Sequence, residues 1–178
     1  MMFINNKFFI YLGLFLVSFV SNAQTAIGKK TVENVNVILD FKNEDNRGVI
    51  LPWVLNQNVV STPVGGTLIF DSNDKKIKYY RSGSNPSWED LSINSGNVDL
   101  TIQSGLQEIG KTTVIGAKTS VAEGVLVLEA NDKAMILPKV TSPHLNINQP
   151  AAGTMVFDPE SKMLCLFNGT EWSFWKAE

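Results

Sequence analysis

The chain has 178 residues, of which 44% are hydrophobic, and its 15 lysines and arginines are balanced by 17 aspartates and glutamates. This near-neutral composition, without a basic stripe, argues against a nucleic-acid partner. The single cysteine, Cys165, excludes a disulfide within the chain, so the fold must rely on its core, on oligomerisation or on a metal. The length suffices for one domain or for two small ones.

The first 23 residues have the features of a secretory signal peptide. Lys7 is the only charge before residue 29, residues 8–20 are mostly apolar, and small side chains precede the expected cleavage site after Ala23. The apolar run is shorter than the ~20 residues that cross a membrane as a helix. We therefore expect export to the cell surface or the extracellular space. The periplasm is the alternative location, and an uncleaved anchor is the alternative interpretation of the segment.

After residue 23 the chain has the pattern of an all-β protein. Apolar positions alternate with a period of two, and Val, Ile, Thr, Phe and Tyr dominate them. Clusters of turn residues interrupt the chain at short intervals, as they do in folds made of many short strands. No further apolar run is long enough for a membrane helix.

Two stretches of the chain are copies of each other. The sequence TAIGKKT at 25–31 returns as TVIGAKT at 113–119, and Trp88 returns as Trp172. Between them the matches keep their order: VILD at 37–40 with LVLE at 126–129, ILP at 50–52 and 136–138, and GTLIFD at 66–71 with GTMVFD at 153–158. We call residues 24–91 copy one, residues 92–112 the linker, and residues 113–178 copy two. The matched positions are Gly, Pro and alternating apolar residues, which build backbone geometry and cores rather than catalytic sites.

Copy one is predicted to contain a strand at 37–41, an extended piece that ends at Pro52, and a β-hairpin of 67–71 with 76–80. Proline cannot donate to a strand ladder, so the extended piece should end a strand or lie at a sheet edge. The hairpin loop has four residues, a length that is commonly built around a type I turn. Asp71 stands just before that loop, where its carboxylate can accept backbone N–H bonds.

The linker and copy two follow the same logic. In the linker, residues 92–97 have the composition of a loop, and residues 98–103 alternate like a short strand. Copy two is predicted to repeat the strand at 125–129, the piece ending at Pro138, and the hairpin of 154–158 with 163–167. Asp158 is the counterpart of Asp71, and Pro159 suits the first central position of a type I turn.

No arrangement of residues predicts a catalytic or metal site. The turn from Asp71 to Asp74 resembles the start of a calcium loop but lacks its glycine and its distal glutamate, so a plain hairpin turn is favoured. His144 is the only histidine, and no serine has the pattern of a nucleophile. The Asn168-Gly-Thr pattern fits an N-glycosylation acceptor, but a tight turn explains it better. We therefore predict a protein that is not an enzyme and needs no cofactor or metal.

Aromatic side chains gather near the end of each hairpin. Trp88, Trp172 and Trp175 could stack on sugar rings if they lay exposed in one groove, which would make the protein a carbohydrate-binding module. Aromatics that close the end of a small β-unit are the favoured interpretation, because Trp88 and Trp172 are a repeated pair.

The ordered motifs resemble those of secreted β-repeat proteins of Bacteroidota, whose surface or fibre-like modules show the same series. The matching residues are Ile27-Gly28, Leu39-Asp40, residues 47–52, residues 66–71 and Trp88 in copy one, and Ile115-Gly116, Leu128-Glu129, residues 133–138, 153–158 and 168–172 in copy two. The resemblance implies a structural role at the cell surface, in some relatives with phage-tail-like trimeric architecture. It carries over no catalytic residue. We therefore expect a self-associating component of a surface or adhesin assembly, with adhesion or gliding machinery as examples.

The second hairpin strand differs between the copies in a way that suggests an interface. Copy one has Lys76 and Lys78 on one side of this strand, which predicts a half-solvated strand. Copy two has Met163, Cys165 and Phe167 on that side, so both sides are apolar and both should be buried. The predicted cover is a second copy of this chain, arranged with three-fold symmetry, and the alternatives are the linker or a larger surface protein.

Overall fold

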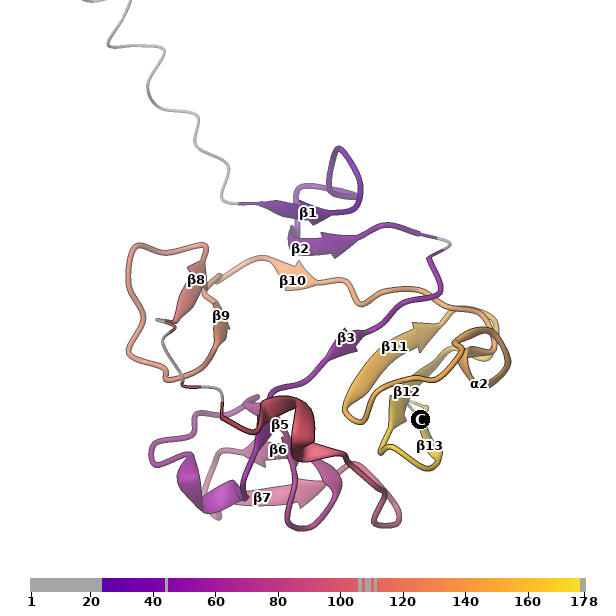
Figure 1. Cartoon of the computed structure of the whole chain (residues 1–178). Helices are drawn as coiled ribbons and strands as arrows, with labels where there is room; N and C mark the ends of the chain where they lie inside the picture. The colour runs from indigo at the N-terminus through magenta and orange to yellow at the C-terminus, as the bar shows by residue number, and fades with distance from the viewer. Residues whose placement is uncertain (1–23, 44, 106, 108–109, 111, 177–178) are drawn as a thin grey trace, which may run out of the picture.

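A computed structural model describes residues 24–43, 45–105, 107, 110 and 112–176 of the chain. The described part is almost entirely β, with four small sheets and only short helical turns, which confirms the predicted fold class (Figure 1). The predicted signal peptide, residues 1–23, lies outside the described residues. Within the described part, no helix has both the length and the apolar character that crossing a membrane requires.

Short strands separated by loops make up both copies. Copy one contains β1 (Thr25–Ile27), β2 (Val37–Phe41), β3 (Val49–Ile50), β4 (Trp53–Val54), the 3₁₀ turn η2 (Gln57–Val59), β5 (Leu68–Asp71), β6 (Lys76–Arg81) and β7 (Ser87–Asp90). Copy two contains β8 (Thr113–Ile115), β9 (Leu126–Leu128), β10 (Ala134–Met135), the one-turn helix α2 (Pro143–Asn146), β11 (Thr154–Asp158), β12 (Met163–Phe167) and β13 (Trp172–Trp175). The strands of the predicted hairpins lie where the alternation placed them.

The two copies fold as the same unit. Each begins with a parallel pair, β1 with β2 and β8 with β9, and each ends with an antiparallel hairpin and a third strand, β5-β6-β7 and β11-β12-β13. The Ile-Leu-Pro step has the same role in both copies. The carbonyl of Pro52 accepts the N–H of Phe70 at 2.9 Å, and the carbonyl of Pro138 accepts the N–H of Phe157 at 2.9 Å.

The two hairpin loops also share their turn chemistry. Asp71 accepts the N–H groups of Asn73 and Asp74 at 3.0 Å, and Asp158 accepts that of Glu160 at 2.9 Å, as the position before the loop predicts. Each loop ends in a lysine with left-handed backbone, Lys75 at φ 58° and Lys162 at φ 59°.

One apolar core joins the two copies. Its buried residues come from both hairpins and from the segments before them: Leu51, Phe70, Ile77, Ala152, Met155 and Leu166. Phe70, Ile77 and Leu166 are completely inaccessible to solvent. In this core each hairpin covers the inner face of the other.

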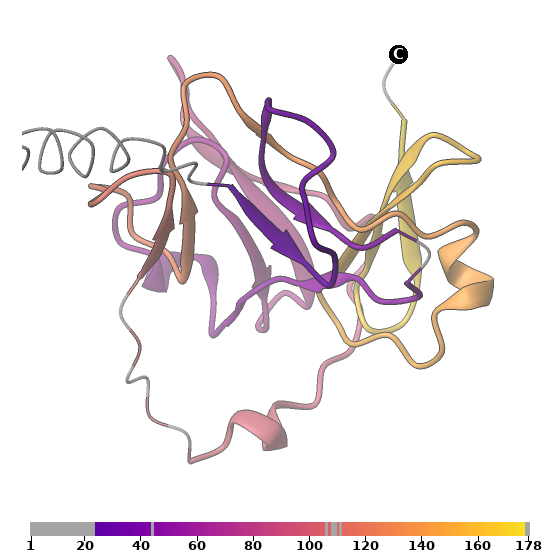
Figure 2. The same ribbon diagram turned by 90° about the horizontal axis from the view of Figure 1, so that it is seen from above.

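The linker departs from the prediction of a strand at 98–103. Residues Leu100–Gln103 form a 3₁₀ turn, η3, which lies apart from the sheets in Figure 2. The carboxylate of Asp99 accepts the N–H of Thr101 at 2.9 Å, which caps the turn. Local capping by an aspartate thus overrides an alternation that has no neighbouring strand to pair with.

Candidate interaction surface

The first surface shared by the copies is a strand edge at β11. β3 of copy one pairs antiparallel with this strand, with Ile50 opposite Thr154 and Val49 opposite Met155. The N–H of Leu51 extends the ladder to the carbonyl of Gly153 at 3.0 Å. The Ile-Leu-Pro strand of copy one therefore completes a sheet whose other strands belong to copy two (Figure 1).

At the second shared edge the roles are reversed: copy two supplies the added strand and copy one receives it. β10 of copy two pairs parallel with β2 of copy one. The N–H of Ala134 donates to the carbonyl of Asn36 at 2.8 Å, and that of Ile136 donates to Leu39 at 2.9 Å. This pairing accompanies burial of the first four residues of β2, of which Val37, Ile38 and Leu39 are at most 3% exposed. The two copies thus exchange their Ile-Leu-Pro strands.

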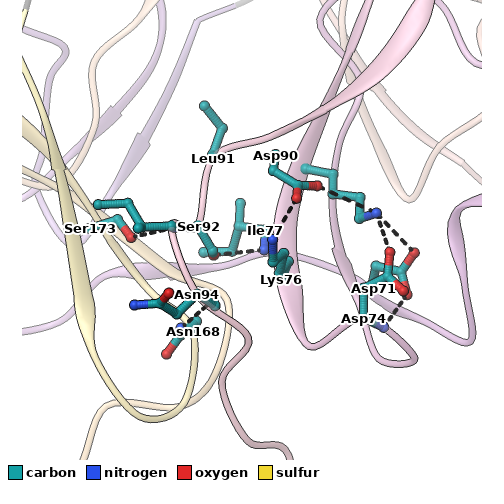
Figure 3. A network of polar contacts seen from close by, with 12 residues as sticks. Asp71, Asp74, Lys76, Ile77, Asp90, Leu91, Ser92, Asn94, Asn168 and Ser173 are labelled. Atoms are coloured by element: carbon teal, nitrogen blue, oxygen red, sulfur yellow. Dashed lines mark hydrogen bonds and ion pairs between the residues drawn. The ribbon is translucent and has the colours of Figure 1, made fainter.

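The start of the linker forms a third contact, this time mainly polar (Figure 3). The side-chain amide of Asn168 donates to the carbonyl of Asn94 at 2.9 Å, and the carbonyl of Asn168 accepts the N–H of Asn97 at 3.2 Å. Nearby, the N–H of Ile93 donates to the hydroxyl of Ser173 at 3.3 Å. These bonds satisfy the polar groups of a chain segment that crosses from copy one onto β13.

Asn168 is a structural residue of this contact. Its side-chain oxygen accepts the N–H groups of Thr170 and Glu171 at 2.9 and 2.8 Å, and the residue is fully buried. This is an Asx turn, in which the side chain replaces a backbone acceptor. The tight turn that the sequence favoured over a glycosylation site is confirmed.

The structure covers the predicted interface strand from within the chain. Cys165 is completely buried among Val140 and Val156 of its own copy, and Ile147 and Met163 pack beside them. The expectation that an outside partner must bury Cys165 is thereby corrected, because the segment between Pro138 and β11 folds over that face. Met163 and Phe167 are half-buried, and their contact with a partner stays a prediction.

Lys78, the counterpart of Cys165 in copy one, is also buried, which corrects the half-solvated strand that the sequence predicts. Its side chain is 7% exposed, and its ammonium group bonds the carboxylate of Asp74 and the side-chain oxygen of Gln57, the latter at 2.9 Å. The carboxylates of Asp90 and Asp71 lie 3.4 and 3.9 Å away (Figure 3).

The charges in this cluster shift each other's pKa. Burial by itself would lower the pKa of Lys78, but the bond to Asp74 and the charges of Asp90, Asp74 and Asp71 outweigh it and raise the pKa above its ordinary value. The hydrogen bond from Lys78 correspondingly lowers the pKa of Asp74. Both groups are therefore charged at neutral pH.

The Asp71–Asp74 turn is used internally, with the oxygens of Asp71 turned to backbone N–H groups. Besides the loop donors, Asp71 accepts the N–H of Gln57 at 2.8 Å. The ammonium group of Lys78 occupies the position between the carboxylates that a cation would take. No group of three or more His, Cys, Asp or Glu side chains in the described residues is arranged to hold a metal.

The two residues weighed for catalysis lie in packing environments. His144, in α2, meets the ring of Phe174 edge-on at 5.9 Å. Burial, together with the charge of Asp158, raises the pKa of the Cys165 thiol to about 11, so it carries no thiolate at neutral pH.

Of the three aromatics considered as an alternative for sugar binding, Trp88 and Trp172 are paired with other rings. The ring centroids of Trp88 and Tyr80 lie 5.3 Å apart with 63° between the ring planes, and those of Trp172 and Phe167 lie 5.3 Å apart with 46° between the planes. Trp175 is 44% exposed, but its indole N–H donates to the carbonyl of Leu91 at 2.8 Å. These tilted pairs close the ends of the hairpins, and a row of coplanar rings does not arise from them.

In the comparison with known proteins, one family model matches part of the chain, and the matched part lies in copy two. A family model described as a phage tail like trimerisation region matches residues 114–177. Neither the curated proteins nor the solved structures contain a match to the chain. The matched region holds one strand exchanged with copy one, β10, and the strand that receives β3. The match supports a structural role in which the chain associates with itself.

Proposed function

We propose that this chain is an exported structural protein that assembles as a homotrimer within a fibre-like or cell-surface structure. The observation that carries the proposal is the match of copy two, residues 114–177, to a phage tail like trimerisation region. The fold gives a physical basis for it. Within the chain, a strand edge of one copy is filled by a strand of the other, as β3 does at β11, and the two hairpins pack face to face.

The trimer predicts a mass three times that of the chain. We expect residues 24–178, purified without the signal segment, to elute as one species of this mass in light scattering at micromolar concentration. The circular dichroism spectrum of the same sample should be dominated by β-structure. A monomer that persists at 100 times higher concentration would contradict self-association.

Location at the cell surface is the second part of the proposal. It is supported by the signal-peptide features of residues 1–23 and by the resemblance to secreted β-repeat proteins of Bacteroidota. We expect an epitope tag after residue 176 to be labelled by antibody on intact cells of the source organism. Labelling only after the outer membrane is permeabilised would place the protein in the periplasm instead. A role in adhesion or gliding, with a larger surface protein as partner, depends on the same result.

A further inference from the structure

The repeat defines which edges each copy can fill. An Ile-Leu-Pro strand, meaning β3 extended to Pro52 or β10 extended to Pro138, has two edges. In copy one, β3 pairs with β11 along the edge to which the N–H of Leu51 points, and we call this the first edge. In copy two, β10 pairs with β2 along the opposite edge, to which the N–H of Ile136 points, and we call this the second edge. Since the strands are equivalent, β3 has a free second edge and β10 has a free first edge among the described residues.

The strand that should receive the first edge of β10 is β5, the counterpart of β11. Only the end of β5, at Phe70 and Asp71, is paired with β4. Its beginning, at Thr67 and Leu68, has no strand alongside in the described chain, and both residues are half-buried. Their counterparts Thr154 and Met155, which lie beside β3, are each only 3% exposed.

The strand that should receive the second edge of β3 is β9, the counterpart of β2. Leu126 of β9 is 46% exposed, whereas its counterpart Val37 in β2 is 3% exposed beside β10. Ile50 of β3 is 56% exposed, whereas its counterpart Ile136 is half-buried where it contacts β2. The exposed apolar side chains thus lie on the edges that the repeat leaves empty.

We propose that copy two of one chain binds copy one of a second copy of this chain, head to tail, through these four edges. β10 of the first chain adds antiparallel to the beginning of β5 of the second, and β3 of the second chain adds parallel to β9 of the first. The register follows from the contacts within the chain, with Met135 opposite Leu68 and Ile136 opposite Thr67.

The backbone groups of these edges match donor to acceptor. The N–H of Ile136 points to Leu39 in its own chain, so the neighbouring N–H groups of Met135 and Leu137 point to the free edge. Leu137 N–H then donates to Gly66 of the second chain, as Leu51 N–H donates to Gly153 within the chain. By the same equivalence, Ile50 N–H of the second chain donates to Leu128 of the first.

This interface deepens the proposed function and rests on it, because it specifies the surface by which the chain associates. One patch binds a different patch, so the contact is heterologous and continues until a ring closes or a filament grows. A ring of three chains is one closed form of such a contact, and it agrees with the match to a trimerisation region. The side chains brought together include Leu68 and Met135, which already flank the common core.

Cysteine cross-linking between chains tests the register. A chain with Thr67→Cys is mixed with a chain with Ile136→Cys, unfolded and refolded together, and oxidised. Residues opposite each other in antiparallel strands lie ~4.5–5.5 Å apart, within the range that a disulfide bridges. We expect disulfide-linked heterodimer at least 10 times more abundant than from Thr67→Cys mixed with Val59→Cys, an exposed residue of η2. The native Cys165 is buried and stays unreactive.

Two further pairs make the result decisive. If circular dichroism shows that either variant is unfolded, Leu68→Cys with Met135→Cys repeats the test at the adjacent position. Ile50→Cys with Thr154→Cys in one chain should give a disulfide within that chain. The same two changes are also placed on separate chains, which are refolded together and oxidised. If these chains form the disulfide-linked heterodimer and the double variant forms no internal disulfide, β3 pairs with β11 of another chain, and the head-to-tail contact is overturned.

The outcomes separate the interface from the proposed function. If the unaltered chain is a trimer but the Thr67 and Ile136 variants cross-link no better than the control, the interface is wrong and self-association stands. If the unaltered chain is a monomer, the proposed function fails as well.

Discussion

Replacement of Gly169 by alanine is expected to lower the free energy of unfolding by about 3–5 kcal/mol. About 1–2 kcal/mol of this loss comes from left-handed backbone strain, and most of the rest comes from a steric clash. Gly169 has φ 95°, and a Cβ there would stand 1.7 Å from the carbonyl oxygen of Asn97. That oxygen belongs to the backbone, so relief requires the linker to move off copy two. The move breaks the bond that Asn168 donates to Asn94 and the bond that Asn168 accepts from Asn97, each worth ~1 kcal/mol.

Gly83 provides the matched control for this change. It also has a left-handed φ, 126°, but a Cβ built on it meets nothing within 4 Å. Gly83→Ala should therefore cost only the backbone strain, about 1–2 kcal/mol. Urea denaturation of both variants measures the difference. Equal losses would mean that the close approach of the linker to Gly169 does not stabilise the fold.

The hairpins could be predicted from the sequence because their signals are local. Period-two alternation on both sides of a four-residue loop, with Asp71 or Asp158 before it, specifies strand, turn and strand in a single stretch of chain. The repeat then added what one copy alone could not. It showed that the Ile-Leu-Pro step has the same place in both units, as the equivalent bonds to Pro52 and Pro138 confirm.

The exchange of strands between the copies could not be predicted from alternation. A period of two says which face of a strand is apolar, but it does not say which strand lies at its edge. β3 and β10 are two residues long in the structure, and their partners, β11 and β2, lie about a hundred residues away in sequence. The exposed apolar residues Ile50 and Leu126 indicate unfilled strand edges only when they are compared with their buried counterparts.

The error at Lys78 has a similar cause. Lysine at an alternating position predicts solvent, and alternation does not reveal that Asp74, four residues earlier in the loop, bonds its ammonium group. The carboxylates that surround it come from three places: the strand end at Asp71, the loop at Asp74 and the neighbouring strand at Asp90. In copy two the counterpart of Asp90 is Phe174, opposite Cys165 in the sheet. The neighbouring strand therefore places an apolar residue opposite the apolar Cys165 and a carboxylate opposite the charged Lys78.

Replacement of Lys78 by methionine is expected to lower the free energy of unfolding by about 3 kcal/mol at pH 7, because it removes one partner of a buried ion cluster. Asp71 is 1% exposed and would lose its nearest cation. The matched control is Lys76→Met on the same strand. Lys76 pairs with Asp90, whose side chain is 41% exposed, and such exposed pairs are worth about 0–1 kcal/mol.

The pH dependence of this loss identifies its electrostatic origin. The pKa of Lys78 is raised on folding, so its contribution is fully present below the ordinary lysine value of 10.5 and is lost as the pH rises through the higher folded value. The pKa of Asp74 is lowered on folding, so its contribution is present above the ordinary aspartate value of 3.8 and is lost as the pH falls through the lower folded value. The difference between the unaltered chain and Lys78→Met, measured by urea denaturation, should therefore be largest between about pH 5 and 9 and shrink at both extremes. A difference that stays constant from pH 3 to 11 would mean that Lys78 stabilises the fold through the packing of its methylene groups and not through its charge.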